Sequence, residues 1–301
     1  MKYIFLFVVV SALGLGSYLA TADHSSVKGI RETEKEKNVL VNFLDIGQGD
    51  ATYIQFEDGE DMLIDCAIDG RILEALGRVM SWKDTIIDYL VVTHPDLDHY
   101  GGCEEVIKRF DIKHILYNGL QKKGSKMFES FWFSTHELDG AYRELTEPET
   151  LHIASTTVEF LYPDHSIAHD AKIPGLQKDT GSNDTSIVTK LTHGTTSVLL
   201  MGDAEEPLEK YLIQTYGNEL DVDILKLGHH GSDSSSSQEF LEEVSPHDAI
   251  ASCGVHNKYG HPSLRVLKRL ERVSSTLWRT DEDGDITARI GEKGYEITKA
   301  K

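Results

Sequence analysis

Short apolar runs recur along most of the chain and alternate with turn residues, a pattern typical of a mixed α/β protein. Residues 39–46 and 51–56 are apolar runs joined by 47–50, which predicts two strands connected by a turn. Further strands are predicted by the apolar runs at 62–64, 89–92, 112–117, 185–191, 198–201, 222–227 and 249–252, and near residues 277, 286 and 295.

Apolar residues three or four positions apart predict helices over 71–80, 101–110, 204–213, 237–244 and 262–273. The stretch 127–142 also has helical spacing and carries a stripe of aromatic residues. We expect this stripe to pack in the core, and a wall facing the substrate is the alternative. Residues 165–182 are polar and predict a long surface loop. No break in composition divides residues 38–301, so we expect one domain with two sheets sandwiched between helices.

The first residues predict a targeting segment. Lys2 is followed by twenty uncharged residues, and Ala20, Thr21 and Ala22 form a small-x-small cleavage signal. We expect residues 1–22 to be a cleaved export signal, which would place the protein in the periplasm or outside the cell. The alternative is an uncleaved membrane anchor, because residues 3–22 are long enough to span a bilayer. Residues 23–37 are polar and predict a linker before a domain at 38–301.

The composition is that of an acidic, folded protein. Asp and Glu number 50 against 30 Lys and Arg, a formal net charge of −20, while 40% of the 301 residues are hydrophobic. Proteins that coat nucleic acid need basic surface to displace counterions, so this charge argues against that class. Cys66, Cys103 and Cys253 lack CxxC spacing, and we expect three buried thiols, with one internal disulfide as the alternative.

The strongest chemical signal is the segment HPDLDH at residues 94–99, which directly follows a predicted strand. It places four potential ligands, His94, Asp96, Asp98 and His99, within six residues. Loops at strand ends are where α/β proteins place functional residues. Neutral imidazole together with carboxylate suits Zn²⁺, Mn²⁺ or iron. The segment therefore predicts a metal site.

Other candidate ligands also follow predicted strands. Asp203 could bridge two metal ions, and the pair His229 and His230 ends another buried strand. Asp65 could orient a ligand histidine from behind, and His261 precedes a helix that could hold a phosphate. Two divalent ions about 3.5–4 Å apart, sharing Asp203 and a hydroxide, would carry out metal-assisted hydrolysis. Two further acids are expected in or near this site, Asp50 and Asp184.

HPDLDH resembles the HxHxDH signature of the metallo-β-lactamase superfamily, with Asp96 in place of the middle histidine. A wider set of motifs is similar to the C-terminal hydrolase domain of ComEC competence proteins. These are FLDIGQGDA (43–51), LID (63–65), THPDLDHYGG (93–102), LMGDAE (200–205), LGHHGS (227–232), NKYGHP (257–262) and RTD (279–281) with Gly284. They run in the family's order over nearly all of the domain. The resemblance implies an αββα four-layer sandwich, the metallo-β-lactamase fold, with a dinuclear metal site.

The resemblance also implies roles for individual residues. The ligands of the two ions would divide into a first set, His94 and Asp96, and a second set, Asp98, His99 and His229. Asp203 would bridge the two ions. The third superfamily motif, usually a histidine, falls at Asn183, which is the expected further ligand.

Other residues are expected to act on the substrate. Those implied to contact it are His230, Ser232, Asn257 and His261. Those implied to take part directly in catalysis are Asp98, Asp203 and His230.

The domain in ComEC proteins is regarded as a nuclease that acts on DNA during uptake, which makes a phosphodiester the first expected substrate. We therefore expect an exported hydrolase with two zinc or manganese ions, acting on DNA or another phosphoester. One alternative is a stand-alone hydrolase of a different phosphoester, such as a phosphocholine ester. Another is a non-catalytic DNA-uptake module. No protein partner is inferred, and a membrane tether is expected only if residues 3–22 are retained.

Basic residues in the second half discriminate between these substrates. Six of them lie between residues 226 and 279, namely Lys226, Lys258, Arg265, Lys268, Arg269 and Arg279. A single groove lined by them would favour a nucleic-acid track, and a scattered arrangement would favour a small substrate. Bound metal ions create a local positive field, so the acidic charge does not exclude a phosphodiester. Long-range electrostatic capture of DNA is expected to be weak.

Overall fold

The computed structural model describes residues 38–138, 140–179 and 181–301. The predicted export signal at 1–22 and the linker at 23–37 lie outside these residues. Within the described part of the chain, no helix combines the length and the apolar character that crossing a bilayer would require.

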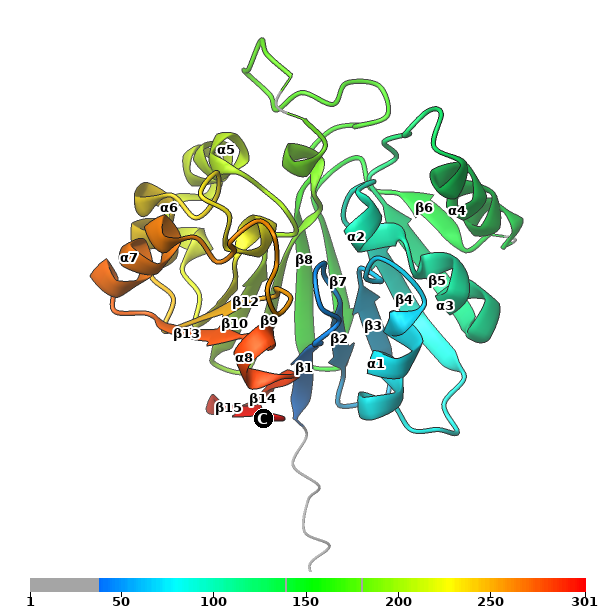
Figure 1. Ribbon diagram of the computed structural model, residues 1–301, viewed down its shortest axis with the longest axis horizontal. Helices are drawn as coiled ribbons and strands as arrows, with labels where there is room; N and C mark the ends of the chain where they lie inside the picture. Colours follow the sequence, from blue (N-terminus) through cyan, green and yellow to red (C-terminus); the bar gives the residue numbers. More distant parts are fainter. Residues whose placement is uncertain (1–37, 139, 180) are drawn as a thin grey trace, which may run out of the picture. The chain divides into compact units, whose positions relative to one another are not determined.

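The described chain forms two β-sheets that face each other (Figure 1). The first sheet has the strand order β15 (Gly294–Lys299), β14 (Ile286–Gly291), β1 (Val39–Phe43), β2 (Thr52–Gln55), β3 (Asp61–Ile64), β4 (Ile86–Val92), β5 (Asp111–Tyr117) and β6 (Tyr142–Glu144). The second has the order β13 (Thr276–Arg279), β12 (Asp248–Ala251), β11 (Ile224–Lys226), β10 (Thr196–Leu200), β9 (Val188–His193), β8 (Thr156–Tyr162) and β7 (Glu149–Ile153).

Helices cover the outer face of each sheet (Figure 1). On the first sheet lie α1 (Arg71–Val79), α3 (Cys103–Arg109) and α4 (Lys126–Glu137). On the second lie α5 (Glu206–Tyr216), α6 (Gln238–Val244) and α7 (Leu264–Arg272). The short helical segments are α2 (Leu97–Tyr100), α8 (Thr280–Asp283) and the 3₁₀ turns η1 (Asn183–Thr185), η2 (Gly217–Leu220) and η3 (Gly228–Gly231).

Alternating side chains on the central strands build three separate apolar layers. On β3, Met62 and Ile64 pack between the two sheets, whereas Leu63 packs under the helices of the first sheet. On β10, Val198 faces the inter-sheet layer and Leu199 the helices of the second sheet. Because successive residues of a strand point to opposite faces, a strand that is buried on both sides reads as one continuous apolar run. The predicted four-layer αββα sandwich is therefore confirmed.

Parallel strands bring the predicted ligands to one edge of the sandwich. β3 and β4 run parallel in the first sheet, and β10 and β11 run parallel in the second. Each of the four strands is followed by one of the predicted ligand segments. Within each sheet the carboxyl ends of parallel strands lie at the same edge. The two edges adjoin, because His99, from the first sheet, lies 3.2 Å from Asp203, from the second, although 104 positions separate them in the sequence.

Two predictions of secondary structure differ from the structure. The antiparallel pair β7–β8 was not predicted, because its exposed residues interrupt the apolar pattern. The predicted helix over 127–142 ends at Glu137, and Tyr142 begins β6. Phe128 and Phe131 are nonetheless buried in the layer under α4, which supports core packing for the aromatic stripe. Residues 165–182 form a loop, as predicted, apart from residue 180, which is not described.

Cys66 and Cys103 form a disulfide, which corrects the expectation of three buried thiols. Cys253 is buried and free, as expected. The pairing arises from the close approach of Gly102 to the loop after β3, where a Cβ on Gly102 would meet the carbonyl oxygen of Cys66 at 2.2 Å. The glycine thus lets the start of α3 come within bonding distance of Cys66, 37 residues away in the sequence.

Candidate metal centre

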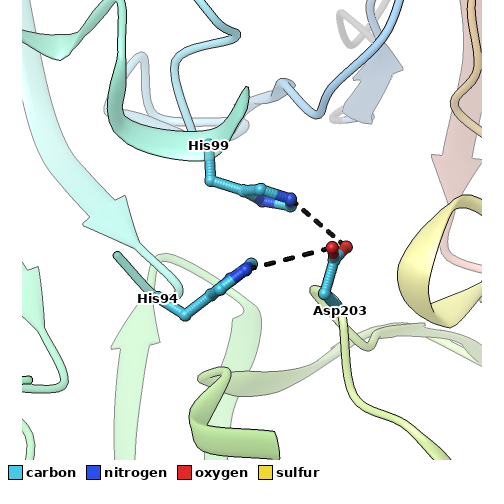
Figure 2. Close-up of side chains that lie close together, drawn as sticks. All are labelled: His94, His99 and Asp203. Carbon is cyan, nitrogen blue, oxygen red and sulfur yellow. Dashed lines mark ion pairs between the residues drawn. The ribbon is translucent and has the colours of Figure 1, made fainter. Parts of the chain in front are cut away.

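A carboxylate lies at the middle of the candidate site (Figure 2). Asp203 Oδ1 is 3.2 Å from His99 Nε2, and Asp203 Oδ2 is 3.9 Å from His94 Nε2. All three side chains are buried, and their potential ligand atoms lie within 4.8 Å of one another. The two oxygens of Asp203 therefore face two different histidines, as a bridging carboxylate would.

Around one oxygen of Asp203 lies what we call the first ligand group, His94, Asp96 and His229. His94 Nε2 is 3.9 Å from Asp96 Oδ2, and His229 Nε2 is 3.8 Å from Asp203 Oδ2. The resemblance had assigned His229 to the other ion, whereas the structure places it on the side of His94.

Around the other oxygen lies the second ligand group, Asp98, His99 and His230. His230 Nε2 is 3.5 Å from Asp98 Oδ2 and 3.7 Å from Asp203 Oδ1. Potential ligand atoms of the three residues lie within 4.8 Å of one another. The structure thus brings His230, rather than His229, together with Asp98 and His99.

The backbone around the histidine pair explains this exchange. His229 and His230 both have positive φ, of 44° and 56°, within the 3₁₀ turn η3. Consecutive left-handed residues are uncommon for non-glycine side chains. The turn directs the two rings to different oxygens of Asp203, with an angle of 63° between the ring planes.

Polar contacts at the rear nitrogens hold three of the four histidines, His94, His99 and His229. His99 Nδ1 donates to Asp65 Oδ2 at 2.7 Å, the orienting role expected for Asp65. His94 Nδ1 lies 3.0 Å from the hydroxyl oxygen of Thr93, and this hydroxyl donates its hydrogen bond to Asp65. His229 Nδ1 donates to Glu205 Oε1 at 2.9 Å. Each ring therefore presents Nε2 toward Asp203, which is the arrangement of histidines that bind metal.

Some of these orienting residues were not anticipated from the sequence. Thr93 and Glu205 belong to the same sequence motifs as His94 and Asp203. Their place in these motifs is the only sequence feature that could have suggested their role. The amide nitrogen of Asn183, the expected further ligand, donates to Glu205 at 3.1 Å and lies 3.3 Å from His229 Nδ1. Its amide therefore supports the Glu205–His229 pair from behind.

Burial and mutual charge set the protonation of the site. Burial lowers the pKa of His94 to about 4, with a further contribution from His99. Burial also acts to lower the pKa of His99, but the carboxylates of Asp203 and Asp65 hold it well above its usual 6.5. The pKa of Asp203 lies well below its usual value despite burial, because His99 and His230 surround it. His99 is therefore protonated, because the carboxylates around it favour a positive charge at this position.

The polar atoms at the centre test whether the residues fit a metal ion. Within the described chain, His94 Nε2, His99 Nε2, Asp203 Oδ1 and both ring nitrogens of His230 are buried without a hydrogen bond. Unsatisfied buried polar atoms are costly and are rare in folded proteins. A divalent cation in each group would satisfy them, and imidazole with carboxylate is a suitable donor set for Zn²⁺, Mn²⁺ or iron. The residues fit.

The remaining residues expected to contact substrate have different surroundings. His261 is half-buried, with its ring 5.5 Å from that of His229, so it lies beside the site. Ser232 is buried, and its hydroxyl bonds that of Ser234. Asn257 uses both ends of its amide within its own loop, which it closes by bonding the backbone of Gly254 and His261. Asn257 therefore shapes the loop that presents His261.

The six basic residues do not all remain available for one groove. Lys226 is buried, and Arg269 and Arg279 pair with Glu206 and Asp281. In the described chain, the members that are exposed and take part in no ion pair are Lys258, Arg265 and Lys268. Three of the six basic residues are thus either buried or neutralised by an acidic partner.

Comparisons with known proteins identify the family and several relatives of this chain. The model of the metallo-β-lactamase superfamily matches residues 44–256. ComE operon protein 3 of Bacillus subtilis is 28% identical over 278 residues, covering 83% of this chain and 33% of its own length. Competence protein ComA of Neisseria gonorrhoeae is 30% identical over 215 residues, covering 71% of this chain and 27% of its own length. The chain thus spans about a third or less of these relatives.

A solved structure shares the fold. CmlA, a diiron β-hydroxylase from Streptomyces venezuelae, superposes with a TM-score of 0.51 at 15% identity, covering 85% of this chain and 54% of that one. At this identity the likeness concerns the arrangement of sheets and helices.

Proposed function

The chain belongs to the metallo-β-lactamase superfamily, and from this premise we propose that it is an exported metal-dependent phosphodiesterase with DNA as its first candidate substrate. The observation that carries the proposal is the buried carboxylate of Asp203, whose two oxygens face two groups of histidines and aspartates with unsatisfied atoms. The similarity to competence proteins supports DNA as the substrate.

The residues of the site divide the work of hydrolysis. When bound, divalent ions in such a site lower the pKa of water and stabilise the charge of the transition state. The first and second ligand groups would hold one ion each, and Asp203 would contact both. Asp65 and Glu205 keep the rings of His99 and His229 in place.

His261 lies where it can contact the substrate. Burial and the neighbouring rings of His230 and His229 lower its pKa to about 4, so it is neutral at physiological pH. A neutral ring beside the ligand groups can donate a hydrogen bond to a phosphoryl oxygen from one nitrogen.

Export is supported by a chemical observation as well as by the predicted signal. The disulfide between Cys66 and Cys103 belongs to an oxidising compartment, because cytosolic thiols are normally kept reduced. We therefore place the protein in the periplasm or outside the cell, with a membrane tether if residues 3–22 are retained.

A second candidate is a hydrolase of a small phosphoester, and the basic residues favour it. Only Lys258, Arg265 and Lys268 of the six are exposed and without an ion pair in the described chain, which is little positive surface for a polymer. A non-catalytic DNA-uptake module fits less well, because it would give no role to the buried polar atoms around Asp203 that lack a hydrogen bond in the described chain.

The test is hydrolysis by the purified protein with Mn²⁺ or Zn²⁺. Single- and double-stranded DNA and bis-p-nitrophenyl phosphate are compared as substrates. We expect cleavage of DNA, and its loss in Asp203→Ala. Asp61→Asn is the matched control, because Asp61 is also buried but bonds Tyr53 away from the ligand groups. Cleavage of the small ester alone would favour the second candidate, and activity that survives Asp203→Ala would contradict the two-ion site.

A further inference from the structure

A buried ion pair adjoins the second ligand group. Lys226 Nζ donates to Asp50 Oδ2 at 2.6 Å, and both side chains are almost inaccessible to solvent, at 2% and 6%. We propose that Asp50 is a further carboxylate ligand of the second group and that Lys226 positions it. The proposal deepens the proposed function, because it concerns the metal ion that this group would hold.

The backbone places Asp50 against the second group. Its N–H donates to the carbonyl oxygen of Asp98 at 3.0 Å, and its own carbonyl accepts from the N–H of Ala67 at 2.9 Å. Gly49 allows this contact, since it has a φ of 121° and a Cβ there would meet the carbonyl oxygen of Asp98 at 2.5 Å. The turn is thus fixed directly beside a ligand residue.

The carboxylate of Asp50 has one oxygen to spare. Oδ2 is taken by Lys226, whereas Oδ1 is buried without a hydrogen bond in the described chain. An oxygen of Asp50 lies within 4.8 Å of ligand atoms of Asp203 and His230, and one lies within the same distance of those of Asp65 and His99. A buried carboxylate oxygen without a partner is costly, and a cation held by His99, His230 and Asp203 would satisfy it.

Lys226 explains why such a ligand can be tolerated. It ends β11, immediately before the turn that carries the two histidines, and its ammonium also bonds the carbonyl oxygen of Leu227 at 3.3 Å. The ammonium offsets one of the negative charges gathered there and occupies one oxygen of Asp50. Asp50 is then left to coordinate through a single oxygen, and an oxygen-richer group suits Mn²⁺ better.

The experiment measures metal binding and does not depend on a substrate. The full chain is stripped of metal, and its affinity for Mn²⁺ and Zn²⁺ is measured by titration calorimetry and chelator competition. The key variant is Asp50→Asn with Lys226→Gln, because two amides replace the ion pair and no lone charge stays buried. Lys226→Gln alone keeps the carboxylate, and Asp61→Asn is the matched control. Circular dichroism verifies that each variant is folded.

We expect the double variant to bind one of two ions at least about 10-fold more weakly, with the other unchanged. Lys226→Gln should lose less affinity, and Asp61→Asn none. A structure of the Mn²⁺ complex should show an oxygen of Asp50 bonded to the ion of the second group. Unchanged affinity for both ions in the double variant, or an Asp50 outside the coordination shell, would overturn the proposal. A protein that binds two ions as described but cleaves no phosphodiester would instead overturn the proposed function.

Discussion

At the scale of single residues, the orientation of His99 depends on Asp65. The carboxylate of Asp65 accepts one hydrogen bond from His99 Nδ1 and two from Thr93, so it fixes the loop as well as the ring. Carboxylates in this position commonly determine how tightly a histidine binds metal. Asp65, which lies behind the ring of His99, thus sets the orientation of that potential ligand.

Asp65→Asn should therefore weaken metal binding by about 10- to 100-fold. The amide cannot accept the ring proton and both bonds from Thr93 with the same strength. Chelator competition with Zn²⁺ or Mn²⁺ measures the effect. Asp69→Asn, at an exposed aspartate that pairs with Arg71, is the control and should bind like the parent. Equal affinities for the two variants would rule out this role for Asp65.

Glu209 is a second buried carboxylate with a measurable consequence. It lies on α5 and accepts hydrogen bonds from the backbone N–H groups of Ser236 and Ser237. Burial raises the pKa of its carboxyl from the usual 4.5 to about 7. The protonated form is favoured by folding, so its contribution is present below pH 4.5 and is lost as the pH rises to about 7.

Glu209→Gln should remove that dependence. Across this pH interval the parent should lose roughly 3 kcal/mol of unfolding free energy from this group, and the variant should not. Urea denaturation at pH 5 and pH 7.5 measures the difference. Glu239→Gln, at an exposed position on α6, should keep the parental slope. Identical slopes in Glu209→Gln and the parent would contradict the assignment.

The residues that could be predicted from the sequence are those with a local signal. HPDLDH, Asp203 and the histidine pair each follow an apolar run, and the structure gathers them at one edge of the sandwich. The side on which each histidine lies was not predictable, because it depends on the left-handed backbone of His229 and His230. The partnership of Asp50 with Lys226 joins residues 176 positions apart and has no local pattern.

At the scale of elements, the disulfide joins the loop after β3 to the start of α3. Cys66 follows Asp65, and its N–H donates to the carbonyl oxygen of His99 at 2.6 Å. The bond therefore links the loop that orients His99 to the segment that carries it. The strands of both sheets were largely predictable from apolar runs, but this link was not, since it depends on the packing of Gly102.

Replacing both cysteines by serine should lower the unfolding free energy by about 4 kcal/mol, from the entropy of the loop that the bond closes. Urea denaturation with and without reductant measures this loss. Reductant should destabilise the parent and leave Cys66→Ser with Cys103→Ser unaffected. Cys253→Ala should still respond to reductant, because its thiol is free. A parent that is insensitive to reductant would show that the bond does not form.

At the scale of the whole molecule, the net charge of −20 opposes the approach of DNA. If DNA is the substrate, as proposed, we expect the local attraction to come from the metal site and, of the six basic residues singled out in the sequence, from Lys258, Arg265 and Lys268, which are exposed and have no ion pair in the described chain. The number of phosphates neutralised by side chains should accordingly be small.

The affinity for DNA should depend only weakly on salt. With about three phosphate contacts, the logarithm of the binding constant should fall against that of the salt concentration with a slope of about −3. Fluorescence anisotropy with an uncleavable phosphorothioate oligonucleotide measures the slope. Lys258→Ala should reduce its magnitude by about 1, whereas Lys113→Ala, at a lysine paired with Asp111, should leave it unchanged. A slope steeper than about −6 would show a wider basic track.

The exposed loop that follows β8 separates the chain into two portions with complementary ligands. His94, Asp96, Asp98 and His99 precede it, and Asp203, His229 and His230 follow it. A protease that nicked this loop would leave two fragments held by the pairing of β8 with β9 and of β1 with β14, by the apolar layer between the sheets, and by the ions of the proposed metal site. The metal ions would then help to hold the two fragments together, and a chelator would destabilise a nicked molecule far more than an intact one.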